Sequence, residues 1–276
     1  MRKLLSTTAL SVSLTLGAVS LATTSLQANP VAQTKQQSGT VINLAGKQRM
    51  LTQKMSKEAL FIAKGVSVDA NKASLAKTIA LFDKTLKGLV AGDESLGLPA
   101  TTNADILAQL KVVTDLWTPF KSAVEKGDLA AINKQNIPLL KNMNKAVGMY
   151  AQASGSTLDP KIAKVINLAG KQRMLSQKMT KELLLVANGI DADANGANAK
   201  KTVALFNSTL KDLDAGCKND GIKAQFAVVA KTLAEYQPIV EKLDISDEAL
   251  ATAEKLNIPL LKESNKAVQM LNASIK

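Results

Sequence analysis

Two arginines, Arg49 and Arg173, are the residues of this sequence best suited to chemistry with a ligand. Each lies in an identical stretch, VINLAGKQRML, which occupies residues 41–51 and again residues 165–175. A guanidinium group is planar, remains charged near neutral pH and can donate two parallel hydrogen bonds to a carboxylate or another oxyanion. We therefore expect this pair to bind a small anion if the fold brings the two copies together.

The residues beside each arginine are small. At the spacing of an α-helix, Gly46 shares one face with Arg49, and Gly170 shares the equivalent face with Arg173. Glycine inside a helix costs up to about 1 kcal/mol relative to alanine, so both positions predict a close approach by another helix. The candidate ligand-binding residues are the arginines, these glycines and the alanines before them: Arg49, Arg173, Gly46, Gly170, Ala45 and Ala169. A further face, expected to be exposed to solvent, carries Asn43, Lys47, Met50, Lys54 and Lys57.

Identity between the two copies is concentrated at this stretch. All 11 positions of residues 41–51 recur, whereas 13 of the 23 positions of residues 67–89 match residues 191–213. Core packing would constrain every helix and would spread identity evenly. A more particular requirement therefore acts on the repeated stretch.

The surrounding sequence predicts an all-α protein made of two tandem four-helix bundles related by internal duplication. Apolar residues recur at intervals of three and four nearly throughout, and alternating β-branched runs are absent. The bundles are predicted at 40–153 and 159–276, after a polar leader at 29–39. The segment Asn-Ile-Pro-Leu-Leu-Lys occurs near the end of each bundle, and its prolines, Pro138 and Pro259, are expected to kink or divide the last helix.

The N-terminus has the pattern of a secretory signal peptide. Arg2 and Lys3 precede an apolar run rich in Ser and Thr, which ends near Ala28. We predict a signal peptide at 1–28, cleaved near Ala28, and an exported protein located in the periplasm of a two-membrane bacterium. A retained membrane anchor is the alternative, although hydroxyl residues and a glycine dilute the run.

Composition argues against several classes of function. Residues 29–276 carry 33 basic and 23 acidic residues, and this net charge of +10 favours anionic partners. The chain has no His and one Cys, Cys217, so the common metal-ligand sets, a disulfide and histidine base catalysis are not expected. We predict no enzymatic activity, no catalytic residues, no metal site and no cofactor. Nucleic-acid binding is not expected either, because the charge is dispersed and aromatic residues are few.

The repeated motif also carries a family resemblance. Ala45-Gly46-Lys47-Gln48-Arg49-Met50 and its copy at 169–174 resemble the motif of the NarX/NarQ nitrate-sensor periplasmic domain and, more broadly, of the PilJ-type N-terminal domain of type IV pilus chemotaxis transducers. The resemblance implies a four-helix sensor domain that dimerises through its first helix. In the nitrate sensors it implies an anion clamped by the motif arginines of two protomers. By position these would be Arg49 and Arg173, with two repeats forming the dimer within one chain.

Two functional interpretations follow from the sequence. In the first, the protein is a soluble, non-enzymatic sensor-type module that binds a small, nitrate-like oxyanion between Arg49 and Arg173. In the second, it is a structural or interaction module whose repeated helix face only packs helices or protomers, with Arg49 paired to a carboxylate such as Glu58 or Glu182 of a neighbour. The candidate partners are a small anion, a membrane-bound sensor or chemotaxis protein, and a second copy of the chain or an internal pseudo-dimer.

Overall fold

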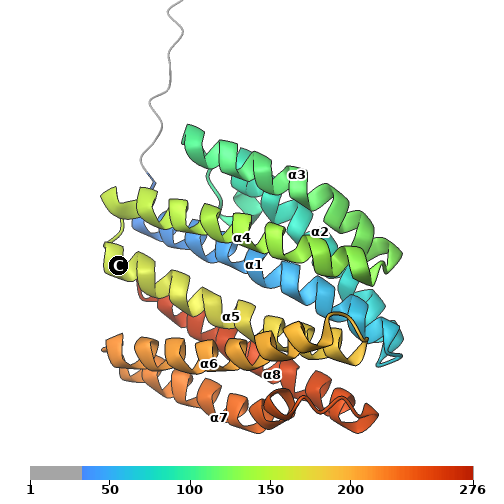
Figure 1. Ribbon diagram of the computed structural model, residues 1–276. Helices are drawn as coiled ribbons and strands as arrows, with labels where there is room; N and C mark the ends of the chain where they lie inside the picture. Colours follow the sequence, from blue (N-terminus) through green and yellow to red (C-terminus); the bar gives the residue numbers. More distant parts are fainter. Residues whose placement is uncertain (1–32, 276) are drawn as a thin grey trace, which may run out of the picture. The chain divides into compact units, whose positions relative to one another are not determined.

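The computed structural model describes residues 33–275, which form eight α-helices and two short 3-10 helices, without a β-strand in that range (Figure 1). The first four α-helices are α1 Lys35–Ala63, α2 Val68–Ala91, α3 Ala104–Lys126 and α4 Leu129–Ala153. The second four are α5 Pro160–Ala187, α6 Ala192–Gly216, α7 Asp220–Lys242 and α8 Asp247–Ala273. The 3-10 helices are η1 Glu94–Leu96 and η2 Ser154–Ser156. The predicted all-α fold is confirmed.

Side-chain caps set where several of these helices begin. The carboxylate of Asp159 accepts a hydrogen bond from the backbone N–H of Lys161 at the start of α5, and Pro160 occupies the first helical position. Asn103, Asp128 and Asn219 cap α3, α4 and α7 in the same way. Each cap satisfies a backbone donor that the first turn of a helix leaves without a partner.

Helices α1–α4 pack as one bundle and α5–α8 as a second, and the most extensive contact between any two helices joins α1 to α5. Figure 1 shows these two helices side by side, with α2 and α3 beyond α1 on one side and α6 and α7 beyond α5 on the other. Residues 33–275 belong to one compact unit. The repeated stretches therefore lie at the interface between the two bundles.

The observed helix boundaries differ from the predicted ones at the polar leader and at the two prolines. Helix α1 begins at Lys35, so the second half of the predicted polar leader is helical; Thr34 and Gln37 form a capping box there. Pro138 and Pro259 lie inside continuous helices and do not divide them. The signal peptide predicted at 1–28 lies outside the described residues. Within 33–275, no helix is both long and apolar enough to span a membrane.

The prediction of a solvent-exposed face on the first helix is wrong. Met50 and Lys57 are buried, and Asn43, Lys47 and Lys54 are partly buried. The physical reason is that α1 packs against α2 and α4 of its own bundle and against α5 and α8 of the other. A helix with neighbours on every side has no face left for solvent.

Candidate functional site

The structure brings Arg49 and Arg173 together at the α1–α5 interface. Both side chains are buried, each with 1% of its surface exposed. A Cβ atom built on Gly46 would lie 3.3 Å from Nη2 of Arg49 and 3.7 Å from Nη2 of Arg173. The two Nη2 atoms are consequently no more than about 7 Å apart. One chain thus contains both halves of the arginine pair.

The glycines of the motif lie directly against this pair. A Cβ on Gly170 would lie 3.3 Å from Nη2 of Arg173 and 3.5 Å from Nη2 of Arg49, which mirrors the geometry at Gly46. Contacts of 3.3 Å are tighter than ordinary van der Waals separations, so even alanine would press on a guanidinium. Glycine at both positions leaves the space that the two guanidiniums occupy.

Each arginine hydrogen-bonds to its own bundle and to the other. Arg49 donates from Nη1 to Oδ1 of Asn144 at 2.7 Å and from Nη2 to the carbonyl of Asn167 at 3.2 Å. Arg173 donates from Nη1 to Oδ1 of Asn265 at 3.0 Å and from Nη2 to the carbonyl of Asn43 at 3.1 Å. A guanidinium has five N–H donors, and the buried Nε of each arginine has no partner. Both arginines therefore retain donors that could serve a ligand.

The charges at this interface are alike in sign. Burial lowers the pKa of Arg49 to about 10, and burial together with the Arg49 charge lowers that of Arg173 to about 9. The pKa of Lys47 is lowered by burial and by Arg173, and that of Lys171 by burial and by Arg49. At pH 7 both guanidiniums are protonated. At the upper limit of about 7 Å, two positive charges repel by about 2 kcal/mol at an effective dielectric constant of about 20.

A carboxylate partner for Arg49, as the structural interpretation supposed, is not present at Glu58 or Glu182. Glu58 instead pairs with Lys54 of its own helix, and Glu182 pairs with Lys178. Among residues 33–275, neither arginine forms an ion pair with an acidic side chain; the ion pairs there involve lysines. The amide and carbonyl oxygens that the arginines contact are neutral, so the buried positive charge is uncompensated by the protein.

The alanines of the motif are buried as well, but they are less directly connected to the arginines. Ala45 is fully buried. Ala169 borders a small void together with Leu210, Phe226 and Val229, residues of its own bundle. Their part in a ligand site remains a prediction, whereas the two glycines lie against the guanidiniums.

Sequence reasoning missed the asparagines that orient the arginines. Asn144 and Asn265 each begin an Asn-Lys-Ala-Val segment that occurs in both repeats, 144–147 and 265–268. That recurrence was a usable signal, because an amide is a neutral acceptor for a guanidinium. The partner on α4 or α8 could not be inferred, since it depends on how the helices pack.

A second set of buried polar residues links the two bundles further towards the C-terminal ends of α1 and α5 than the arginines. Asn136, from the repeated Asn-Ile-Pro segment of α4, accepts hydrogen bonds from Gln53 of α1 at 2.9 Å and from Lys181 of α5 at 3.0 Å. Asn257 of α8 does the same for Gln177 at 2.9 Å and for Lys57 at 2.8 Å. Burial lowers the pKa of both lysines to about 8. Each bundle therefore inserts a lysine into the other, which ties α1 and α5 in register.

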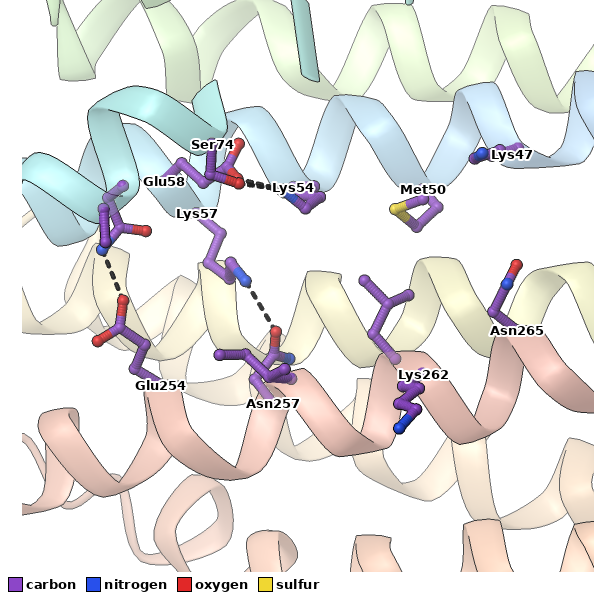
Figure 2. A pocket seen from close by; sticks show the side chains of 14 residues that line it. Lys47, Met50, Lys54, Lys57, Glu58, Ser74, Glu254, Asn257, Lys262 and Asn265 are labelled. Carbon is purple, nitrogen blue, oxygen red and sulfur yellow. Dashed lines mark hydrogen bonds and ion pairs between the residues drawn. The ribbon is translucent and has the colours of Figure 1, made fainter. Parts of the chain in front are cut away.

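Two cavities flank the α1–α5 interface at equivalent positions of the repeats. The first, the α1–α8 cavity, has a volume of about 560 Å³. Figure 2 shows Lys57 bonded to Asn257 there, Lys54 beside Glu58, and Glu254 reaching back towards α2. The second, the α4–α5 cavity, has a volume of about 620 Å³ and reaches Arg49 itself. Of the two arginines, Arg49 is thus the one that lines one of these cavities.

Comparison with known proteins agrees with this duplicated arrangement. The family model of the type IV pili methyl-accepting chemotaxis transducer N-terminal region (PilJ) matches residues 31–145 and, a second time, residues 160–264. The methyl-accepting chemotaxis protein McpN of Pseudomonas aeruginosa is 29% identical over 122 residues. That alignment covers 42% of this chain and 22% of McpN, so the chain spans only a fraction of that relative. No solved structure matches the chain.

Proposed function

This chain belongs to the PilJ family of chemotaxis transducer N-terminal domains, and from that membership we propose that it is a sensor-type, non-enzymatic binding protein for a small oxyanion. The anion binds between Arg49 and Arg173 at the α1–α5 interface. The proposal includes export to the periplasm and a membrane-bound chemotaxis protein as the partner that responds to the bound state.

The observation that carries this proposal is the buried, uncompensated pair of guanidiniums. A buried charge without a counter-charge is unfavourable by several kcal/mol, and here two like charges lie close together. An anion equidistant from both would reverse that repulsion and would use donors that the protein leaves without partners. Nitrate, nitrite and carboxylates have the planar geometry that suits guanidinium donors.

Ligand binding would also act on the packing of the two bundles. The site is made of one arginine from each bundle, and each arginine bonds to a backbone carbonyl of the other. An anion that attracts both guanidiniums therefore favours the arrangement in which α1 and α5 are closely packed. A preference for one arrangement of two helices is what a sensor module requires in order to signal.

The test is anion-dependent stabilisation in a buffer of low ionic strength. Ligand at 100 times its Kd stabilises the folded state by about 2.7 kcal/mol, which corresponds to a rise in Tm of about 5–10 °C for a chain of this size. Nitrate, nitrite, formate and sulfate would be titrated separately, by thermal unfolding and by calorimetry. We expect one of the planar anions to produce this rise.

Arg49→Met and Arg173→Met should each abolish the response, and Lys111→Met on the exposed surface of α3 should keep it. Circular dichroism checks that each variant is folded. A Tm that no anion changes, or an equal rise in both arginine variants, would refute the proposal.

A structural role for the same interface is the second candidate, and the lysine–asparagine bonds between the bundles favour it. In that case the α1–α5 interface only holds the bundles together. The arginine variants would then change Tm by the same amount with and without anion, which separates the two candidates in one experiment.

A further inference from the structure

The α4–α5 cavity and its repeat counterpart differ in charge. Basic residues line the α4–α5 cavity without any carboxylate: Arg49, Lys141, Lys164 and Lys171. The α1–α8 cavity also contains lysines, but Glu58 and Glu254 are part of its lining (Figure 2). Duplication alone would make the two cavities alike, so the difference needs a separate explanation.

The lysines of the α4–α5 cavity have no polar side-chain partner among the described residues. Among the described residues, Lys141, Lys164 and Lys171 form neither an ion pair nor a side-chain hydrogen bond. In the α1–α8 cavity, by contrast, Lys54 contacts Glu58, and Lys57 donates to Asn257. Lys47 and Lys262 of the α1–α8 cavity also lack such partners, but that lining includes Glu58 and Glu254. The positive charge of the α4–α5 cavity is therefore the less compensated of the two.

One lysine accounts for part of this difference. Lys164 occupies the position that Thr40 holds in the first repeat. In the α1–α8 cavity, Glu254 occupies the position that Asn133 holds in the first repeat. Glu254 accepts hydrogen bonds from Ser67 and Asn71, both at 2.6 Å, and so adds negative charge only on the α8 side.

The α4–α5 cavity also has an apolar wall. Ile137, Leu140, Leu168 and Met174 contribute to its lining, and Ile137 is 58% exposed although it is a large hydrophobic residue. A bare inorganic anion would gain nothing from these side chains. A molecule with a short hydrocarbon body would cover them and gain about 25 cal/mol for each Å² removed from water.

We propose that the α4–α5 cavity binds a small organic dianion, with one negative group at Arg49 and the other near Lys141 and Lys164. The apolar body between the groups lies against Ile137 and Leu140. A volume of about 620 Å³ is within the range that encloses small organic ligands. This inference rests on the proposed function, because it uses Arg49 as the inner end of the site, and it adds the class of ligand and the side from which the ligand enters.

Calorimetric titration of the full protein with succinate, butyrate and nitrate tests the inference. Succinate has two carboxylates on a short chain, and butyrate has one carboxylate on a chain of the same length. We expect succinate to bind about tenfold more tightly than butyrate, and the difference to shrink as ionic strength rises.

The repeats provide matched variants. Lys141→Ala and Lys164→Thr should each weaken succinate binding by about twofold to fivefold, and the second change installs the residue of the first repeat. Lys262→Ala alters the residue of the α1–α8 cavity that corresponds to Lys141 and should leave succinate affinity unchanged.

The outcomes separate the two proposals. Nitrate binding with equal affinity for succinate and butyrate would overturn this inference and leave the proposed function intact. Succinate binding that depends on Lys262 but not on Lys164 would also overturn it, since the ligand would then occupy the other cavity. Absence of binding by all three anions would overturn both.

Discussion

Replacement of Asn136 by alanine is the sharpest perturbation of the interface that holds the two bundles. The side chain of Asn136 is completely buried. It accepts from Gln53 at 2.9 Å and from Lys181 at 3.0 Å, and it donates to the carbonyl of Thr52 and to Oγ of Ser56, both at 3.0 Å. Alanine removes all four bonds and leaves a buried ammonium group without its amide partner.

The expected loss of stability follows from these four hydrogen bonds. A hydrogen bond to a charged group contributes about 1.5–3 kcal/mol and a neutral one about 0.5–1.5 kcal/mol. One charged and three neutral bonds give a loss of about 4 kcal/mol, after allowance for relaxation of the site. At about 2–4 °C for each kcal/mol, the Asn136→Ala variant should unfold roughly 8–16 °C below the wild type.

Chemical denaturation at pH 7, where Lys181 is mainly protonated, gives the free energy of unfolding directly. Asn133→Ala, on the same helix but with an exposed hydrogen bond to Asp191, is the control and should change the free energy by less than about 1 kcal/mol. The double variant Asn136→Ala/Lys181→Met should be less destabilised than the sum of its parts by about 1.5–3 kcal/mol, because methionine does not need the lost acceptor.

If the free energy of unfolding of Asn136→Ala lies within about 1 kcal/mol of the wild-type value, the reasoning is refuted. Buried polar groups that lose their partners should destabilise the protein by more than this. Strict additivity in the double variant would refute it as well. In that case Lys181 would not depend on Asn136, and the bond between the bundles would contribute nothing to their association.

The remaining predictions concern charge and space at the same interface. Burial lowers the pKa of Lys57 and Lys181 from 10.5 to about 8, so the unfolded chain binds more protons than the folded protein between these values, and the free energy of unfolding should rise from about pH 8 to pH 10.5. Lys57→Met/Lys181→Met should lose most of that rise in a series of urea titrations, and a slope equal to that of the wild type would contradict the assignment. Gly46→Leu should destabilise the protein by about 1–3 kcal/mol through overpacking against the arginines and should abolish any anion response. Gly148→Leu, with nothing within 4 Å of its Cβ position, is the matched control, and equal effects of the two leucines would contradict the close approach at Gly46.

Much of the fold could be predicted from the sequence because helices depend on local patterns. Apolar spacing predicted two bundles of four helices, and the start predicted for the second bundle, residue 159, is the capping residue of α5. The repeated stretch itself pointed to Arg49 and Arg173. Of the two outcomes expected at the prolines of α4 and α8, division of the helix is wrong, because the surrounding helix tolerates the missing donor instead of ending there.

The environment of the arginines could not be predicted, because their partners are distant in the chain. Asn144 lies 95 residues from Arg49, and the carbonyl of Asn43 lies 130 residues from Arg173. The exposed face expected on α1 was wrong for the same reason. Helical periodicity distinguishes polar from apolar faces, but it does not tell which neighbouring helix will cover a polar one.

Residue type and helical spacing were enough to predict two equivalent helices that each carry an arginine among small residues, since they fix what one helix face presents. Tertiary packing was needed to show that these faces meet within one chain, that neither arginine has a carboxylate partner among residues 33–275, and that one flanking cavity is lined by cations and apolar side chains without a carboxylate. Those properties depend on the packing of α1 against α5 and on side chains contributed by α4 and α8. The repeat supplied two arginine-bearing helix faces, and the packing of the two bundles joined them.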